Sequence, residues 1–83
     1  MGKKIIKIIC FAGLRKYFGV EANVSVGPDA TYSMVLDELV ASNPEAEEVL
    51  KSCRIAVNEE FVLLNEKLKP FETLFLIPPS SGG

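Results

Sequence analysis

Apolar and polar residues alternate along two early stretches of the chain, a pattern typical of β-strands. Residues 4–11, "KIIKIICF", are rich in β-branched side chains, which favour a strand. Strand geometry places Ile6, Ile8 and Cys10 on one face, and Ile5, Lys7, Ile9 and Phe11 on the other. Residues 21–26, "EANVSV", predict a second, half-buried strand. The connection between the two strands is expected to hold one helical turn that ends at Gly19.

The period changes from that of a strand to that of a helix after Thr31, which is a candidate N-cap. One apolar stripe follows at helical spacing and consists of Val35, Leu36, Leu39 and Val40. Asn43 can then cap a second, short helix, with Pro44 at its first position.

Three further apolar runs predict strands in the second half of the chain. Residues 53–58 direct Ile55 and Val57 inward, and a turn at "NEE" leads into a short run at 61–64. Residues 73–78 form the last predicted strand, with Leu74 and Leu76 inward. Leu68 is the expected apolar anchor of the polar connection between these runs.

The order of elements predicts an α+β fold. A helix between two hairpin-like halves must cover one face of a single sheet. We expect a ubiquitin-like β-grasp: a mixed sheet of four to five strands, with the first and last strands parallel at its centre, covered on one face by one main helix plus a short second helix. Residues 1–78 would form this domain, and residues 79–83 an extended, flexible C-terminal tail that carries Gly-Gly.

Composition and charge exclude several classes of function. A chain of 83 residues is one small domain, and a net charge of -2 argues against nucleic acid as a partner. There is no histidine and there are only two cysteines, which argues against a metal site and removes the usual general base. Cys10 and Cys53 lie in apolar strands, so we expect reduced core thiols and a cytoplasmic protein. The N-terminal apolar run is too short to span a membrane.

The last seven residues, "IPPSSGG", have a composition that suits an inserted tail. Pro78 and Pro79 fix their φ angles and stiffen the exit from the sheet. Ser80 and Ser81 are short, and Gly82 and Gly83 have no Cβ to obstruct a narrow channel. The five residues 79–83 can reach roughly 16 Å at about 3.3 Å each. The alternative is an ordinary disordered end.

Three stretches resemble the MoaD family, the small sulfur-carrier subunit of molybdopterin synthase, within the MoaD/ThiS ubiquitin-like superfamily. They are "FAGLRKYFG", "RIAVNEEFV" and "LIPPSSGG", and the resemblance runs nearly end to end. The chain departs from the family where Asn58-Glu59-Glu60 replaces the usual Asn-Gly turn, and where "KPFE" replaces Gly-Asp before the last strand. Glu59 is therefore expected to adopt a positive φ.

The resemblance implies that Gly83 is a substrate and that no side chain of this chain acts as a catalyst. A MoeB-like activating enzyme would use ATP to adenylate the Gly83 carboxylate, and a sulfur donor would convert it to a thiocarboxylate. The tail would then enter a MoaE-like large subunit and give sulfur to the cyclic pterin precursor of molybdopterin. The resemblance also implies a heterotetramer with the large subunit, a monomeric chain in isolation, and no permanently bound cofactor.

A second candidate site is the sheet face opposite the helix. The alternation of side chains along each strand, here called parity, places six apolar residues on this face, namely Ile9, Phe11, Ala56, Phe61, Phe75 and Ile77. The polar residues expected on the same face are Lys7, Arg54 and Thr73. A contiguous apolar patch usually marks an interface, although loops or the second helix could also cover this face. The resemblance places Phe11, Phe61 and Ile77 at the partner contacts. Arg15 either pairs with a partner carboxylate or solvates a loop.

Three other functions are compatible with the sequence. The chain could carry sulfur for another pathway, such as thiamine synthesis or tRNA thiolation. It could be a ubiquitin-like modifier that forms an isopeptide bond through Gly83. It could also be an interaction domain with an inert terminus.

Overall fold

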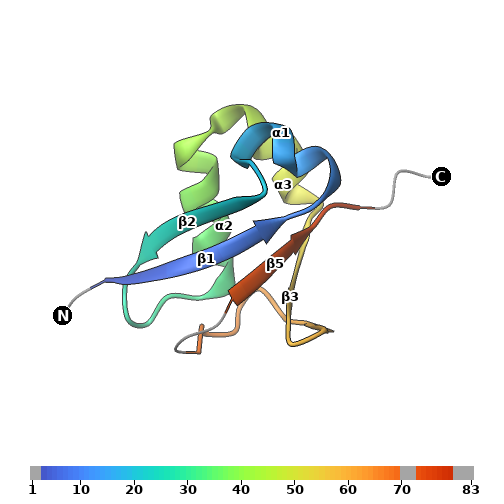
Figure 1. Cartoon of the computed structure of the whole chain (residues 1–83). Helices are drawn as coiled ribbons and strands as arrows, with labels where there is room; N and C mark the ends of the chain where they lie inside the picture. The colour runs from blue at the N-terminus through green and yellow to red at the C-terminus, as the bar shows by residue number, and fades with distance from the viewer. Residues whose placement is uncertain (1–2, 70–72, 80–83) are drawn as a thin grey trace.

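The computed structural model describes residues 3–69 and 73–79, which form one five-stranded mixed sheet with helices on one side. The strands are β1 (Lys4–Cys10), β2 (Glu21–Val26), β3 (Arg54–Val57), β4 (Glu60–Phe61) and β5 (Thr73–Ile77). The helices are α1 (Arg15–Phe18), α2 (Tyr32–Ser42) and α3 (Glu47–Lys51), with short 3-10 turns η1 (Ala12–Leu14) and η2 (Pro44–Ala46). Figure 1 shows α2 and α3 behind the sheet and α1 beside its upper edge.

The sheet order is β2-β1-β5-β3-β4, and this confirms the β-grasp prediction. β1 and β5 are parallel neighbours at the centre, whereas β1–β2, β3–β5 and β3–β4 are antiparallel. Because the last strand has a neighbour on both sides, the chain leaves the sheet from its middle rather than from an edge (Figure 1).

The core lies between the inner face of the sheet and α2 with α3. Alternate residues of β1 and β5, including Ile8 and Leu76, pack with Leu39 of α2 and Leu50 of α3 in one apolar cluster. The predicted strand parities are confirmed for β1, β2 and β5. Residues that sequence periodicity did not assign to the core also enter it, such as Leu14 of the first connection.

The two helix caps predicted from the sequence, at Thr31 and Asn43, are confirmed. The Thr31 hydroxyl accepts a hydrogen bond from the Met34 amide at 3.4 Å, and the Asn43 side-chain oxygen accepts one from the Glu45 amide at 3.3 Å. The other end of the Asn43 amide donates to the Tyr17 carbonyl at 3.2 Å, which links the α2–α3 junction to α1. Gly19 ends α1 as predicted, and its φ of 79° with ψ of -173° is a conformation that essentially only glycine adopts.

The short fourth strand is the main difference from the predicted elements. β4 ends at Phe61, although the apolar run 61–64 suggested a longer strand. The reason is that the chain turns towards the start of α2, where the Leu64 carbonyl accepts a hydrogen bond from the Ser33 amide at 2.9 Å. Leu68 is buried as predicted, and its amide donates to the Ala30 carbonyl at 3.0 Å.

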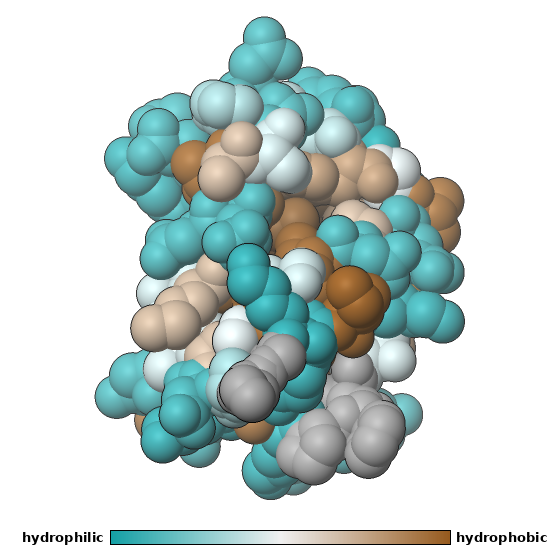
Figure 2. Space-filling view, turned by 90° about the vertical axis from the view of Figure 1, so that its left-hand side faces the viewer, coloured by the Kyte–Doolittle hydropathy of each residue, from teal (hydrophilic) through white to brown (hydrophobic). Residues whose placement is uncertain are grey.

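The side of the molecule where β1 begins is shown in Figure 2. There hydrophilic residues surround smaller hydrophobic areas, so this end of the sheet does not present one large apolar surface. Among the described residues, no helix has the length and apolar character needed to cross a membrane.

Candidate tail-root site

The outer face of the sheet is the face that α2 and α3 leave uncovered. Register aligns Ile9 of β1, Phe75 of β5, Ala56 of β3 and Phe61 of β4 in one row across four strands. Ile77 lies beside Arg54 one pleat further towards the end of β5. Phe11 follows β1 at the same end and stacks on Phe75, with ring centroids 6.0 Å apart. The structure therefore brings the predicted apolar residues together.

Ala56 differs from its predicted role. It has the expected parity, but only 7% of it is exposed, so it does not belong to the open part of this face. Its short side chain lies between its register neighbours Phe61 and Phe75, which are larger and cover it. Phe61 is 59% exposed and Phe11 is 36% exposed, so the accessible apolar area is concentrated in the aromatic rings.

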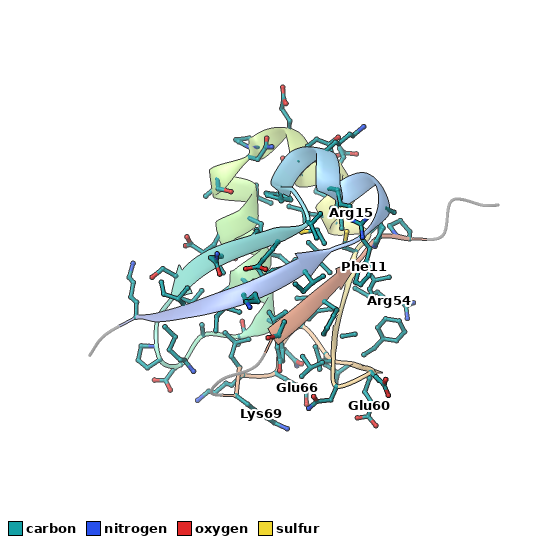
Figure 3. All side chains as sticks on the ribbon, in the orientation of Figure 1. Phe11, Arg15, Arg54, Glu60, Glu66 and Lys69 are labelled. Atoms are coloured by element: carbon teal, nitrogen blue, oxygen red, sulfur yellow. The ribbon has the colours of Figure 1, made fainter. Side chains whose placement is uncertain are left out.

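Two arginines flank the end of β5, and each lies against a phenylalanine (Figure 3). The Arg15 guanidinium carbon is 6.0 Å from the centre of the Phe11 ring, and its Nε donates to the Cys10 carbonyl at 3.1 Å. The structure thus gives Arg15 an internal contact that neither sequence hypothesis included. The Arg54 guanidinium carbon lies 5.3 Å from the centre of the Phe61 ring.

The root of the tail adjoins this face. Ile77 ends β5, and Pro78 and Pro79 follow it as the last described residues. An open groove of about 470 Å³ lies next to them and is lined by Ser52, Arg54, Phe61, Ile77, Pro78 and Pro79. The predicted tail residues Ser80, Ser81, Gly82 and Gly83 lie outside the described residues.

Arg54 and Ser52 are groove residues that were not among the predicted site residues. Parity did place Arg54 on the outer face, which was the only available signal. Its contact with Phe61 depends on the β3–β4 hairpin, because the two residues lie on neighbouring strands one pleat apart. Ser52 lies between α3 and β3, where neither periodicity applies.

The two cysteines belong to the core. Cys10 is 0% exposed and Cys53 is 6% exposed, and both are free thiols. Burial raises the pKa of Cys53 to about 11, with the nearby Cys10 acting in the same direction. The Cys53 thiol donates to the Val49 carbonyl at 3.0 Å. Burial also raises the pKa of Cys10, although the Arg15 guanidinium opposes this rise. Both thiols are therefore protonated at neutral pH and are poor nucleophiles.

Within residues 3–69 and 73–79, no group of three or more histidine, cysteine, aspartate or glutamate residues could hold a metal ion. The distinctive surface feature is instead an apolar face with two arginines at the point where the chain leaves the sheet.

Comparisons with known proteins agree with this architecture. The molybdopterin synthase sulfur carrier subunit of Chlamydomonas reinhardtii is 36% identical over 81 residues, which cover 94% of this chain and 98% of that protein. The crystal structure of SAMP1 from Haloferax volcanii superimposes with a TM-score of 0.81 at 30% identity, covering 96% of this chain and 100% of that one.

A third similarity is to a complex. A chain in the protein–protein complex of subunits 1 and 2 of the molybdopterin-converting factor from Helicobacter pylori has a TM-score of 0.56 and 27% identity, and the match covers 96% of this chain and 100% of that chain. The model of the ThiS family matches residues 8–83. With nearly the whole sequence matched, this chain belongs to the ThiS family.

Proposed function

We propose that this protein is the sulfur-carrier subunit of a molybdopterin synthase and that it carries sulfur on the carboxyl group of Gly83. The observation that carries this proposal is the nearly full-length similarity to a sulfur carrier subunit of that synthase. The fold supports it, because β5 leads directly from the centre of the sheet into Pro78 and Pro79, beside an apolar face suited to docking.

The proposed reaction begins in an activating enzyme. A carboxylate oxygen of Gly83 attacks the α-phosphate of ATP, and pyrophosphate leaves. A sulfur nucleophile then attacks the acyl carbon and displaces AMP, which leaves a thiocarboxylate. In the large subunit, the thiocarboxylate sulfur bonds to a carbon of the cyclic pterin precursor and displaces an oxygen leaving group from it. Water then cleaves the bond between the sulfur and the acyl carbon of Gly83, which leaves the sulfur on the pterin and restores the carboxylate. This chain contributes the reacting terminus and its positioning, and the partners contribute the catalytic groups.

The partner contacts are assigned to the outer face. We propose that Phe11, Phe75 and Ile77, together with Ile9 and Phe61, pack against the large subunit and the activating enzyme. The Helicobacter pylori complex supports a second subunit as a partner. In this proposal two carriers and two large subunits form a heterotetramer in the cytoplasm, and the isolated chain is a monomer.

Intact-mass spectrometry tests the proposal directly. Incubation with the activating enzyme, ATP and a sulfide source should increase the mass of the chain by one oxygen-to-sulfur exchange. Deletion of Gly83, or addition of one residue after it, should abolish this change and molybdopterin formation. Ser80→Ala is the matched control, because it alters the tail but keeps its length and its Gly-Gly end. Molybdopterin formation by the chain without Gly83 would refute the mechanism.

A second candidate is a protein modifier that forms isopeptide bonds with lysines through Gly83. It is favoured by the similarity to SAMP1 of Haloferax volcanii, which is also named small archaeal modifier protein 1. A tagged chain expressed in its own cells should then produce a ladder of larger conjugates that disappears when Gly83 is deleted. A sulfur carrier would give the mass change without the ladder.

A further inference from the structure

Among the described residues that line the groove at the root of the tail, one has a charged side chain, Arg54. Four segments meet there: Ser52 after α3, Arg54 in β3, Phe61 in β4, and Ile77 with the two prolines after β5. The apolar walls are Phe61 and Ile77, and the prolines close the side next to the tail. Any protein that receives the tail must approach this groove, because the groove and the tail share Pro78 and Pro79.

Arg54 contacts the Phe61 ring, but none of the described residues neutralises its charge. Its guanidinium stacks on the Phe61 ring at 5.3 Å, and in the described part of the chain it has no ion pair. Two lysines elsewhere do have acidic partners, Lys51 with Glu48 at 3.6 Å and Lys67 with Asp29 at 3.9 Å. Arg15, on the other side of β5, already uses its Nε to bind the Cys10 carbonyl. Among the described residues, the Arg54 guanidinium donates no hydrogen bond, whereas that of Arg15 donates one.

This arrangement suits recognition of a carboxylate. A guanidinium offers a planar fork of donors that matches both oxygens of a carboxylate, and stacking on a ring leaves those edge donors accessible. Arg54 lies on β3, which is paired on both sides, so the backbone that presents the guanidinium is already fixed before docking. When a partner covers the apolar walls, water is excluded and the ion pair becomes stronger than it would be on an open surface.

We propose that Arg54 is a docking residue that binds an aspartate or glutamate of the protein that receives the tail, next to an apolar side chain of that protein seated between Phe61 and Ile77. The choice of occupant rests on charge complementarity, since the described residues that line the groove include one cation and no anion. The inference rests on the proposed function, because it requires a partner that takes the Gly83 end.

Binding measurements on the full chain test this inference. We would measure the affinity for the molybdopterin synthase large subunit and for the activating enzyme of the same organism by calorimetry. Arg54→Gln should weaken binding to at least one of them about tenfold, the effect of losing one charge-assisted hydrogen bond. Arg54→Lys should restore part of this loss, and Arg54→Glu should weaken binding further. The difference in affinity between wild type and Arg54→Gln should decrease as the salt concentration is raised.

Lys51→Gln is the matched control. It removes the same charge three residues earlier, on α3, from an exposed ion pair with Glu48. Its effect on binding should stay within about twofold, as for an ordinary surface substitution.

In the sulfur-transfer assay, Arg54→Gln should raise the KM for the carrier about tenfold and leave kcat unchanged, because the residue acts in docking and not on the reacting carboxyl group.

The outcomes separate the two proposals. If wild type binds and Arg54→Gln binds both proteins equally well, the assignment of Arg54 is overturned and the carrier function stands. If wild type binds neither protein, both proposals are overturned. A decrease in kcat without a change in KM would also overturn a docking role. Self-association of the chain that Arg54→Gln abolishes, seen by sedimentation, would show that a second copy occupies the groove instead. Restoration of Arg54→Glu binding by an acid-to-lysine change in the partner would support the inference.

Discussion

Glu59 provides the sharpest test of how local sequence and backbone geometry determine stability here. β3 ends at Val57 and β4 begins at Glu60, so Asn58 and Glu59 form a two-residue hairpin turn. Both have positive φ, 53° at Asn58 and 69° at Glu59, which is the pattern of a type I′ turn. Asparagine tolerates this conformation, whereas glutamate has no side-chain interaction that compensates for it. Glu59→Gly should therefore stabilise the protein.

The expected gain is a difference between two terms. A residue with a Cβ in the left-handed region costs about 1–2 kcal/mol, which glycine avoids. Glycine also increases the conformational entropy of the unfolded chain, which lowers the stability of the folded state by about 0.5–1 kcal/mol. The free energy of unfolding should thus rise by about 0.5–1 kcal/mol. For a domain of this size, that change raises Tm by roughly 2–8 °C.

Thermal and urea unfolding of wild type, Glu59→Gly and Glu60→Gly would measure the effect. Glu60→Gly removes the same charge one residue later, but Glu60 is the first residue of β4 and pairs with Val57. Glycine in a strand should lower stability by about 0.5–1 kcal/mol. The two variants should therefore shift Tm in opposite directions. If Glu59→Gly leaves Tm unchanged or lowers it, the turn is not strained and the reasoning is refuted.

Three other changes probe the face, the core thiols and the first connection. Ile77→Glu should keep the circular dichroism spectrum of the wild type but weaken binding to the large subunit more than tenfold. Thr73→Glu, at the opposite end of β5, should weaken this binding less. Equal affinity of wild type and Ile77→Glu for the large subunit would exclude Ile77 from the interface. The thiol of Cys53 has a folded pKa of about 11 against 9.0 when unfolded, so stability should fall as pH rises from 9 towards 11, because only the unfolded chain releases the proton. Urea titrations across this range should show the decline, and Cys53→Ala should reduce it. Gly19→Ala should lower Tm by roughly 4 °C or more, because a residue with a Cβ pays about 1–3 kcal/mol at φ 79° and ψ -173°, even though the added Cβ meets no other atom. Gly13→Ala, which has no positive φ, should not lower Tm, and equal Tm values for the two variants would contradict this reasoning.

The fold was predictable because local patterns and burial agree along most of the chain. Alternation in residues 4–11 and 73–78 gives strands whose inward faces match the apolar stripe of α2. A helix between two hairpin-like halves then leaves few ways to bury those faces. The caps at Thr31 and Asn43 were predictable for the same reason, because each makes its contact within three residues of itself.

Contacts between distant segments were not predictable in this way. The hydrogen bond from Asn43 to the Tyr17 carbonyl joins residues 26 positions apart, and no period in the sequence encodes it. The loop that runs from β4 to Leu68 is fixed by backbone bonds to the start of α2, and backbone groups are common to every residue type. The burial of Ala56 depends on the size of its neighbours on two other strands, which parity does not describe.

The candidate site was predictable to a similar extent. Parity identified the outer-face residues Phe11, Phe75 and Ile77, since each lies on a strand or directly after one. The two arginine–phenylalanine pairs required the folded structure. Arg15 reaches Phe11 through the turn of η1, and Arg54 reaches Phe61 across a hairpin. For Arg15 the structure adds a hydrogen bond from Nε to the Cys10 carbonyl, which neither sequence hypothesis included.

The two walls of the tail-root groove differ in how firmly the sheet holds them. β5 is bonded to β1 on one side and β3 on the other, and its inward residues Leu74 and Leu76 are almost fully buried, so opening it would disrupt the core. β4 has two residues, lies at the sheet edge and pairs only with β3, so its opening costs far less. The wall that directs the tail is thus the firm one, and the wall that carries Phe61 beneath Arg54 is the adjustable one. A partner can therefore displace Phe61 without moving the strand that carries Arg54 or the point from which the tail leaves.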